Sequence, residues 1–525
     1  MNVLRQFERH YKTPTIIVYL ILIHIISEDI EKKNWEVHNI CKGSDFMYNN
    51  GQLLRSTPEE QGISSSAILN FINATEKTKS GLHSFMLLRH GFVIAEGWWA
   101  PYSKEVPHML FSLSKSFTST AIGLAVEEKL LSTEDKVISF FSDKLPEKID
   151  ENLQQMTIKD LLMMGTGHAE DTTDTIVKAE DGDWVKAFLS LEVEYTPGTH
   201  FLYNTGATYM LSAIIQKVTG ETLLDYLTPR LFKPLGIENP TWDKCPKGIN
   251  TGGFGLSLKT EDIAKFGQLY LQKGIYNGKR IVPEAWIAEA TSKQISNGND
   301  EDNDWSQGYG YQFWRCKHNE YRGDGAFGQL CVVMPDKDTV LATTSGSEDI
   351  GLILNHIWDN LLPAICDKPL EANHKAYSEL EDKLRMLHIP APQGGCCSDL
   401  KDNISGNEYE LNENLTKLER VAFDFSGEVA VVSFTDARGI HKISCANEWW
   451  LNGETDITGD TSKIYASGTW MKNDIYVMSW IFVETPFCYT TKCSFDGNQI
   501  KIEIETNVSM GPKVVTEIQG RLINN

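Results

Sequence analysis

The sequence lacks the cysteine patterns that organise small disulfide-rich domains and structural zinc sites. Its ten cysteines are scattered over 525 residues, Cys396 and Cys397 are adjacent, and no Cys-x-x-Cys pair occurs. These spacings indicate neither a disulfide framework nor a zinc site. We therefore expect reduced thiols, no metal site and no cofactor.

Basic charge is also scarce. The chain has 49 Lys and Arg against 71 Asp and Glu, a formal net charge of -22. This balance argues against nucleic acid as a partner, because phosphate binding needs a basic surface. An apolar content of 41% and a charged content of 23% are typical of a soluble globular protein, and the length indicates two or more domains.

A long hydrophobic run is missing as well. The apolar residues from Ile16 to Ile26 are too few for a membrane span of about 20 residues. Basic residues before them resemble the start of a signal peptide, but no small-x-small cleavage site follows. Three interpretations of residues 1–52 stay open: an atypical export signal, a membrane-associated segment, or a non-native extension of a soluble protein. Membrane association is expected only through residues 14–26, so the location stays open between cytoplasmic and exported or membrane-associated.

Two familiar enzyme motifs can be set aside. No Gly-x-Ser-x-Gly occurs, so the nucleophile elbow of the α/β-hydrolases is absent. Gly323-x-Gly325-x-x-Gly328 has the glycine spacing of a dinucleotide-binding loop, but it leads into a β-like run that ends at Pro335 instead of a helix. The sequence therefore predicts neither fold.

The stretch around Ser112 carries the strongest chemical signal. Residues 117–126 are small or apolar on nearly every side, which predicts a buried helix. Burial disfavours the charged form of Lys115 and lowers its pKa, and in a helix Lys115 lies beside Ser112. A hydroxyl next to an easily neutralised amine is a nucleophile next to its base. Free backbone N–H groups at the helix start can stabilise an oxyanion there.

The same residues also have an ordinary interpretation, in which Ser112 caps the helix and Lys115 extends to water. Ser-x-x-Lys tetrads are common, and a second one runs from Ser398 to Lys401 in a polar stretch after a Pro/Gly-rich linker. We interpret the second tetrad as a loop without chemistry. The apolar helix after Ser112 favours the chemical interpretation of the first.

Together with that helix, Ser112-x-x-Lys115 resembles the nucleophile motif of the serine β-lactamase and penicillin-binding protein superfamily. The resemblance is to its class C β-lactamase-like branch, which includes esterases, D-amino-acid peptidases and 6-aminohexanoate-dimer hydrolases, and it covers roughly residues 53–365. It implies an α+β protein with the β-lactamase/transpeptidase-like fold, an antiparallel sheet flanked by helices plus an all-helical subdomain. Ser112 would then be the nucleophile and Lys115 its base.

A second motif of that family, Tyr-x-Asn, is similar to Tyr203-Asn204-Thr205, 91 residues after Ser112. The resemblance makes Tyr203 a proton shuttle between nucleophile and leaving group, and two nearby cationic groups would lower its pKa. Thr205 stands where the family has Asn and is a candidate substrate-binding residue. Because Thr lacks the paired donor and acceptor of an amide, this departure argues against recognition of β-lactams or peptidoglycan.

The third family motif, Lys-Thr-Gly, is absent. Its place falls on Tyr321–Gln329, where missing side chains near Gly325 would let a substrate lie against the backbone of a strand. The resemblance implies that the N–H of Ala326 completes an oxyanion hole with that of Ser112. Arg322 is the candidate substitute for the missing cation.

One histidine lies between these motifs in the sequence. Residues 157–168 predict a helix with a glycine stop, in a segment that is similar to one of the same family. His168, at its end, could serve as a general base. We interpret it instead as a structural or rim residue.

We divide the chain into an N-terminal extension (1–52), a β-lactamase-like domain (53–366), a helical linker (367–403) and a C-terminal domain (404–525). The last part consists of short alternating runs broken by turns such as Asp496-Gly497-Asn498. This pattern predicts an antiparallel β-domain, either a sandwich or a lipocalin-like barrel. Its role stays open between shaping the substrate cleft, mediating oligomers and adding stability.

The resemblance implies a metal-independent serine hydrolase that forms an acyl-enzyme on Ser112, with Lys115 and Tyr203 as general base and acid. The substrate would be a small-molecule ester, amide or peptide. Departures at the second and third motifs favour hydrolysis of an ester or small amide. The alternatives are a non-catalytic, penicillin-binding-like sensor, and a D,D-peptidase or β-lactamase.

Overall fold

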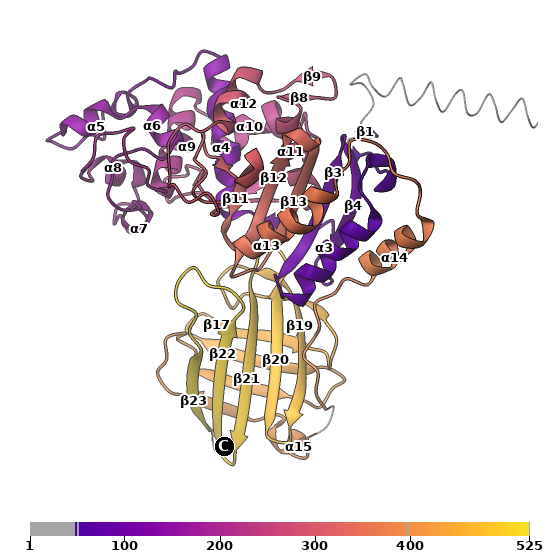
Figure 1. Ribbon diagram of the computed structural model, residues 1–525. Helices are drawn as coiled ribbons and strands as arrows, with labels where there is room; N and C mark the ends of the chain where they lie inside the picture. The colour runs from indigo at the N-terminus through magenta and orange to yellow at the C-terminus, as the bar shows by residue number, and fades with distance from the viewer. Residues whose placement is uncertain (1–47, 50–51, 396–397, 524–525) are drawn as a thin grey trace, which may run out of the picture.

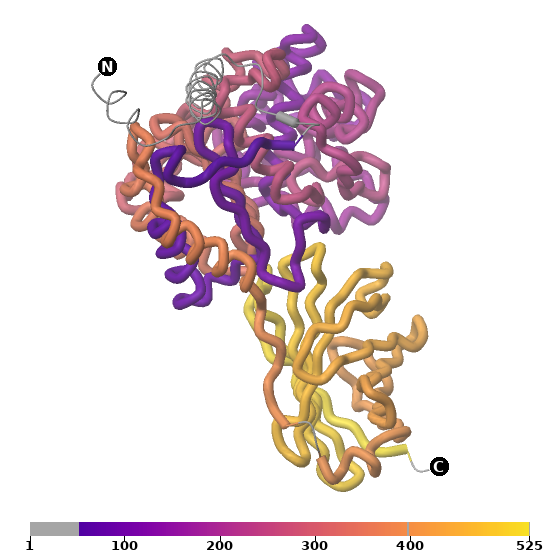
Figure 2. The backbone as a smooth tube through the Cα atoms, turned by 90° about the vertical axis from the view of Figure 1, so that its right-hand side faces the viewer, coloured from indigo at the N-terminus to yellow at the C-terminus, as the bar shows by residue number. Residues whose placement is uncertain are grey.

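The computed structural model describes residues 48–49, 52–395 and 398–523. A lobe of helices and sheet is joined to a β-rich domain by a segment that contains helix α14 (His374–Arg385) (Figure 1). Figure 2 shows this segment running along the lobe and down into the β-rich domain. The apolar segment at residues 14–26 lies outside the described residues. Among the helices that are described, none is both long and apolar enough to cross a membrane.

A six-stranded antiparallel sheet forms the centre of the lobe, in the order β10-β11-β12-β13-β3-β4. Its strands are β3 (Leu82–Arg89), β4 (Phe92–Trp98), β10 (Trp314–Arg315), β11 (Tyr321–Gly325), β12 (Gln329–Met334) and β13 (Thr339–Ser345). The turn between β3 and β4 is His90-Gly91, with φ of 50° and 80°, as a two-residue type I′ turn requires. Strands β3 and β4 therefore form a tight hairpin.

Helices cover both faces of this sheet, because successive side chains of a strand point to opposite sides. Phe85 and Leu87 belong to one core with α3 and α13, and Met86 and Leu88 belong to the other with α4 and α11. The bounds of these helices are α3 (Ser65–Lys77), α4 (Ser114–Glu127), α11 (Thr260–Leu271) and α13 (Ile350–His356). All residues of α4 up to Ala125 are buried, which confirms the predicted buried helix.

The remaining helices of the lobe gather at one end of the sheet as an all-helical subdomain (Figure 1, upper left). They are α5 (Glu151–Gln155), α6 (Ile158–Leu162), α7 (Thr173–Val177), α8 (Trp184–Leu189), α9 (Thr205–Thr219), α10 (Leu223–Leu227) and α12 (Glu284–Thr291). The short strands of the lobe are β1 (Tyr48–Asn49), β2 (Gln52–Leu53), β5 (His108–Met109), β6 (Thr241–Trp242), β7 (Leu256–Leu258), β8 (Ile275–Tyr276) and β9 (Lys279–Arg280). An antiparallel sheet flanked by helices, with a helical subdomain, is the α+β architecture that the resemblance implied.

Helix α6 is shorter than predicted, because the chain after it turns to bond the loop before Tyr203. The helix expected to reach His168 ends at Leu162, and Met164 adopts a left-handed conformation with φ of 61°. The carbonyl of Met164 can then accept a hydrogen bond from the N–H of Leu202 at 2.9 Å. The end of α6 therefore fixes the loop that leads into Tyr203.

Ten antiparallel strands form a nearly barrel-shaped sheet in the C-terminal domain (Figure 1). They are β14 (Glu408–Leu411), β15 (Arg420–Asp424), β16 (Ala430–Asp436), β17 (Gly439–Cys445), β18 (Leu451–Thr455), β19 (Ser462–Lys472), β20 (Ile475–Phe482), β21 (Cys488–Asp496), β22 (Gln499–Thr506) and β23 (Thr516–Leu522), with the short helix α15 (Lys401–Ile404) before them. The N–H of Gly468 donates to the carbonyl of Ala446 at 2.9 Å, which brings the two ends of the sheet together. The prediction of an antiparallel β-domain is confirmed in its barrel-like form.

Candidate active site

Ser112 lies immediately before the buried helix α4. It is the central residue of a single 3-10 turn, η2 (Phe111–Leu113), and its side chain is half-buried. The N-cap of α4 is Leu113, which has no capping side chain, so the alternative in which Ser112 caps the helix is wrong. Phe111 has a φ of 49°, a left-handed conformation that aromatic residues rarely adopt. Ser112 is thus presented by a strained turn.

Lys115 points toward Ser112 and does not extend to water, because its side chain is only 1% exposed. Its Nζ lies 2.9 Å from Ser112 Oγ, 3.1 Å from Thr205 Oγ1 and 2.9 Å from the carbonyl oxygen of Gly253. A neutral amine has two N–H donors and one lone pair. The donors suit the Gly253 carbonyl and the Thr205 hydroxyl, which leaves the lone pair for the proton of Ser112.

The surroundings of Lys115 favour this neutral form. Burial lowers the pKa of Lys115 from 10.5 to about 7, and the charges of Asp171 and Asp324 oppose this shift only in part. Within the described residues no salt bridge joins Lys115 to a carboxylate. A large fraction of the amine is therefore unprotonated near neutral pH.

Tyr203 lies against both of these side chains. Its hydroxyl hydrogen-bonds with Ser112, and Lys115 Nζ lies 4.9 Å from the centroid of its ring. The ring stacks on Trp314, with the centroids 5.2 Å apart. Burial raises the pKa of Tyr203 and outweighs the hydrogen bond to Ser112. The lowered pKa predicted from the sequence is wrong, because desolvation outweighs the nearby amine, which is itself easily neutralised.

Thr205 also reaches the cluster, but its hydroxyl is engaged by Lys115. It is the first residue of α9, and its N–H donates to Asp171 Oδ1 at 3.1 Å. Gly253 completes this arrangement because a side chain there would not fit. A Cβ on Gly253 would lie 2.6 Å from Thr205 Cγ2 and 3.4 Å from Lys115 Nζ.

Strand β11 runs close to the Ser112 turn because two of its residues are glycines. A Cβ on Gly325 would lie 2.1 Å from the carbonyl oxygen of Leu110, and one on Gly323 would lie 2.4 Å from Leu113 Cδ1. These glycines therefore serve the approach of two backbone segments, which differs from the substrate contact predicted for Gly325. Ala326 follows directly and is half-buried.

Arg322 does not join the cluster. Its side chain is fully buried, its Nε donates to Asp324 Oδ2 at 2.8 Å, and its Nη1 donates to the carbonyl of Asp304 at 3.1 Å. The guanidinium also lies over the ring of Trp305, 4.8 Å from its centroid. Because its guanidinium is fully buried and its charge is paired with Asp324, Arg322 is poorly suited to bind a substrate carboxylate.

Two further sequence interpretations concern residues outside the cluster. His168 is buried, bonds Thr166 Oγ1 through Nδ1 at 2.9 Å and lies edge-on to Phe188, which agrees with a structural role. In the second Ser-x-x-Lys tetrad, Ser398 Oγ donates to the carbonyl of Asn473 and accepts from the N–H of Leu400. Ser398 therefore stabilises a turn, as its loop interpretation implies.

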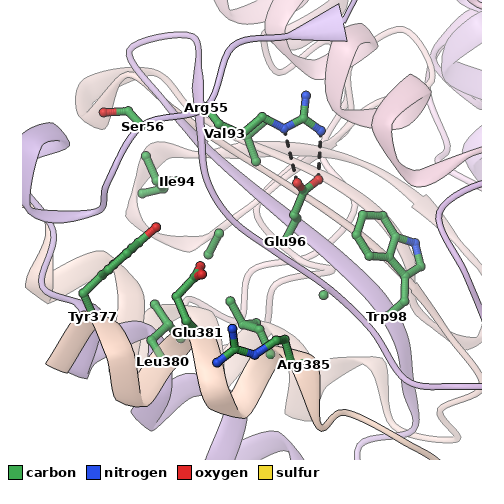
Figure 3. Close-up of a pocket in the computed structure, with 13 residues that line it drawn as sticks. Arg55, Ser56, Val93, Ile94, Glu96, Trp98, Tyr377, Leu380, Glu381 and Arg385 are labelled. Atoms are coloured by element: carbon green, nitrogen blue, oxygen red, sulfur yellow. Dashed lines mark hydrogen bonds and ion pairs between the residues drawn. The ribbon is translucent and has the colours of Figure 1, made fainter. Parts of the chain in front are cut away.

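A separate surface cavity lies on the other side of the sheet, between β4 and α14 (Figure 3). It has a volume of about 330 Å³ and is lined by residues that include Arg55, Glu96, Tyr377 and Glu381. Figure 3 shows Arg55 paired with Glu96, at 2.9 Å, across its rim. No residue of the Ser112 cluster lines this cavity, so it does not extend the candidate site.

The sequence interpretation missed three residues of the site, namely Gly253, Asp171 and Trp314. Gly253 belongs to a glycine-rich stretch, Gly252-Gly253-Phe254-Gly255, which was the available signal that a backbone approaches another group closely. Asp171 and Trp314 carried no comparable signal, since both contact the site from segments far along the chain.

Comparison with known proteins agrees with this geometry. Residues 75–349, slightly more than half of the chain, match the family model described as Beta-lactamase. The 6-aminohexanoate-dimer hydrolase of Paenarthrobacter ureafaciens is 24% identical over 289 residues, which cover 51% of this chain and 73% of that protein. An uncharacterized protein of Alkalihalophilus pseudofirmus is 23% identical over 265 residues, which cover 45% and 72%.

Among solved structures, the octameric penicillin-binding protein homologue from Pyrococcus abyssi has a TM-score of 0.46 and 15% identity, covering 86% of this chain and 99% of that chain. The match to the family model does not depend on this likeness. It spans α4 with Ser112 and Lys115, the loop with Tyr203, and strands β3 and β4 and β10 to β13. The chain therefore belongs to the serine β-lactamase and penicillin-binding protein superfamily, a family of serine hydrolases.

Proposed function

We propose that this protein hydrolyses an ester or a small amide through an acyl-enzyme on Ser112. The observation that carries the proposal is the position of Lys115, whose buried Nζ lies 2.9 Å from Ser112 Oγ. With a pKa lowered to about 7 by burial, this amine can accept a proton at neutral pH. A nucleophile in contact with a base of matched pKa is the arrangement that covalent catalysis requires.

In the acylation step, Ser112 Oγ attacks the substrate carbonyl carbon while its proton passes to Lys115 Nζ. The carbonyl oxygen becomes an oxyanion. We assign its stabilisation to the backbone N–H groups of Ser112 and Ala326, because the glycines of β11 bring that strand up to the Ser112 turn. Two fixed donors aimed at the developing charge contribute without rearranging during the reaction.

Tyr203 is proposed to protonate the leaving group. Its raised pKa keeps the hydroxyl protonated, so it can donate to the departing oxygen or nitrogen as the carbon–oxygen or carbon–nitrogen bond breaks. The Lys115 ammonium, 4.9 Å from the Tyr203 ring, then returns a proton to the tyrosine. Water hydrolyses the acyl-enzyme by the same steps in reverse, which restores Ser112 and neutral Lys115.

The residues around the nucleophile support an ester or small amide over a β-lactam. The only cation on β11 is Arg322, which is buried and paired with Asp324, and the Thr205 hydroxyl is engaged by Lys115. A β-lactam carboxylate would therefore meet no exposed cation on β11, and the Thr205 hydroxyl could donate only one hydrogen bond to it. The relative named as a 6-aminohexanoate-dimer hydrolase also supports a small amide as an alternative to an ester.

Turnover of p-nitrophenyl acetate and of nitrocefin by the wild type and by Ser112→Ala tests the proposal. We expect ester turnover in the wild type, a loss of at least about a thousandfold in Ser112→Ala, and no nitrocefin turnover. Ser398→Ala, in the second Ser-x-x-Lys tetrad, is the matched control and should keep full activity.

The other outcomes point to the alternatives. Nitrocefin turnover that depends on Ser112 would indicate a β-lactamase or D,D-peptidase. No turnover of either substrate, together with no labelling of Ser112 by a fluorophosphonate, would contradict catalysis and favour a penicillin-binding-like sensor.

A further inference from the structure

Two residues beside the proposed catalytic groups have unusual backbone conformations. Phe111, directly before Ser112, has a φ of 49°, and Phe327, directly after Ala326, has a φ of 66°. For residues other than glycine a left-handed conformation is unfavourable, and it persists only where the surroundings hold it in place. Something must therefore stabilise both segments of the proposed oxyanion hole.

The ring of Phe487 contacts both of these aromatic residues. Its centroid lies 6.3 Å from that of Phe111 and 5.8 Å from that of Phe327, each with an edge-to-face geometry. The rings of Phe111 and Phe327 also meet, at 5.3 Å and nearly perpendicular. The three phenylalanines form one cluster, and edge-to-face pairs of this kind stabilise it beyond the area that they bury.

Phe487 does not belong to the lobe that carries Ser112. It stands on the turn between β20 and β21 of the C-terminal β-domain, which Figure 1 places below the sheet of the lobe. The cluster therefore joins the proposed catalytic groups to a domain in which we find no other chemistry.

The turn that carries Phe487 is held in one conformation. The N–H of Phe487 donates to Thr485 Oγ1 at 3.1 Å, and the N–H of Phe482 donates to the carbonyl of Phe487 at 3.1 Å. Asn507 bonds both flanking residues, donating to the carbonyl of Pro486 at 2.9 Å and accepting from the N–H of Cys488 at 2.7 Å. A ring presented by such a turn has little freedom to move away.

The same turn is bonded to the strand that precedes the nucleophile. The N–H of Met109 in β5 donates to the carbonyl of Glu484 at 2.8 Å, and the hydroxyl of Tyr102 donates to the carbonyl of Thr485 at 3.2 Å. A Cβ on Gly346, next to Ser347, would lie 2.7 Å from the carbonyl oxygen of Pro486. The three residues directly before Phe487 are thus held against the lobe.

We propose that Phe487 is a positioning residue for the Ser112 site: the β-domain, through this side chain, holds the Phe111–Ser112 turn and the Ala326–Phe327 segment in their left-handed conformations. This proposal rests on the proposed function, because that function identifies the two segments as parts of the oxyanion hole. It assigns to the β-domain the preorganisation of the oxyanion hole, which a displacement of about 1 Å is enough to impair.

The test compares Phe487→Ala, Phe487→Leu and Tyr489→Ala in the full-length protein. Tyr489 is the matched control, because it is a half-buried aromatic residue two positions away whose ring pairs with those of Trp480 and Phe482 and packs on the core of the β-domain. For p-nitrophenyl acetate we expect kcat of Phe487→Ala to fall about ten- to a hundredfold with KM changed by no more than about twofold. Phe487→Leu should recover most of the activity, and Tyr489→Ala should retain it.

Hydrogen exchange supplies a readout that needs no activity. Backbone amides of residues 109–113 and 325–328 should exchange faster in Phe487→Ala than in the wild type, and at the wild-type rate in Tyr489→Ala. The proposal would be overturned if Phe487→Ala kept both the kcat and the exchange rates of the wild type. It would also be overturned if these amides exchanged equally fast in Phe487→Ala and Tyr489→Ala, because that result would report a general loosening of the β-domain. If the wild type turns over no ester, the proposed function fails while the exchange comparison still decides whether Phe487 holds the two segments.

Discussion

Two polar clusters in this protein place cationic side chains in opposite settings. Lys115, in the lobe, is buried against hydroxyl and carbonyl groups. His441, in the β-domain, lies between two carboxylates, with Nε2 2.9 Å from Asp436 Oδ1 and Nδ1 2.6 Å from Asp456 Oδ1. Arg438 brings a further cation to Asp436 and donates to it through Nε at 2.9 Å.

The two settings shift the pKa values in opposite directions. Burial lowers the pKa of Lys115 to about 7. Burial also opposes the charge on His441, but the hydrogen bonds and charges of Asp436 and Asp456 outweigh it and raise the pKa of His441. Burial alone thus does not lower the pKa of a cationic group. The group must also lie without a paired carboxylate. The Lys115 cluster is suited to proton transfer, and the His441 cluster to holding strands β16 and β17 together.

Replacement of Lys115 should give the largest effect that separates the two clusters. In Lys115→Met the proposed base is lost while the side chain keeps its length and apolar stem, so we expect kcat on p-nitrophenyl acetate to fall about a hundred- to ten-thousandfold. Lys401→Met, in the second tetrad, should leave kcat unchanged. Thermal unfolding followed by circular dichroism checks that both variants fold.

A Lys115→Met protein that folds and keeps near-wild-type kcat would break the comparison, because another group would then have to accept the Ser112 proton. Labelling of Ser112 by a fluorophosphonate provides a second measurement on the same variants. The rate of labelling at Ser112 should fall in parallel with kcat.

The acid limb of the pH profile should report the same amine. Only the neutral form of Lys115 accepts a proton, and lowering the pH below about 7 converts it to the ammonium. We expect kcat/KM to fall about tenfold per pH unit below that value, which amounts to about a hundredfold at pH 5. Tyr203 does not contribute this limb, since burial raises its pKa. A flat profile between pH 5 and 8 would contradict the assignment of Lys115 as the base.

The residues that could be predicted from the sequence are those set by local patterns. Ser112 and Lys115 are three positions apart at the start of an apolar helix, and Tyr203 belongs to a short motif. Thr205 and Gly253 contact Lys115 across 90 and 138 positions of the chain. The local patterns around Thr205 and Gly253 mark these two residues but do not reveal that Lys115 is their common partner. The partners that orient the Lys115 amine therefore became visible only in the fold.

Arg322 shows a different limit. Its place in the chain fits the missing cation of the third motif, but residues two positions apart in a strand point to the same side, and Asp324 takes its charge there. That pairing could have been inferred from the sequence once β11 was recognised as a strand. The contact of Phe487 with Phe111 could not, because it depends on how a separate domain docks on the lobe.

A moderate effect is expected from the hydroxyl that orients Lys115. Thr205→Val keeps the shape of the side chain but removes the acceptor 3.1 Å from Nζ. A lost hydrogen bond of about 1 kcal/mol corresponds to a fall in kcat of about fivefold, and Thr205→Ser should restore it. An unchanged kcat in Thr205→Val would mean that the Gly253 carbonyl alone orients the amine.

The smallest effect is expected in the β-domain, and it should be on stability and leave activity unchanged. Because the folded-state pKa of His441 is raised, its stabilising charge is fully present below the unfolded value of about 6.5 and is lost as the pH rises through the folded value. Between pH 6 and 8.5 the melting temperature of the wild type should therefore decrease by about 2–4 °C more than that of His441→Gln, measured by calorimetry on the full-length protein. Gln retains an N–H donor for Asp436 but cannot titrate. If the two proteins lose stability equally over this range, His441 is not the titrating group, and the contrast between a paired and an unpaired cation would rest on Lys115 alone.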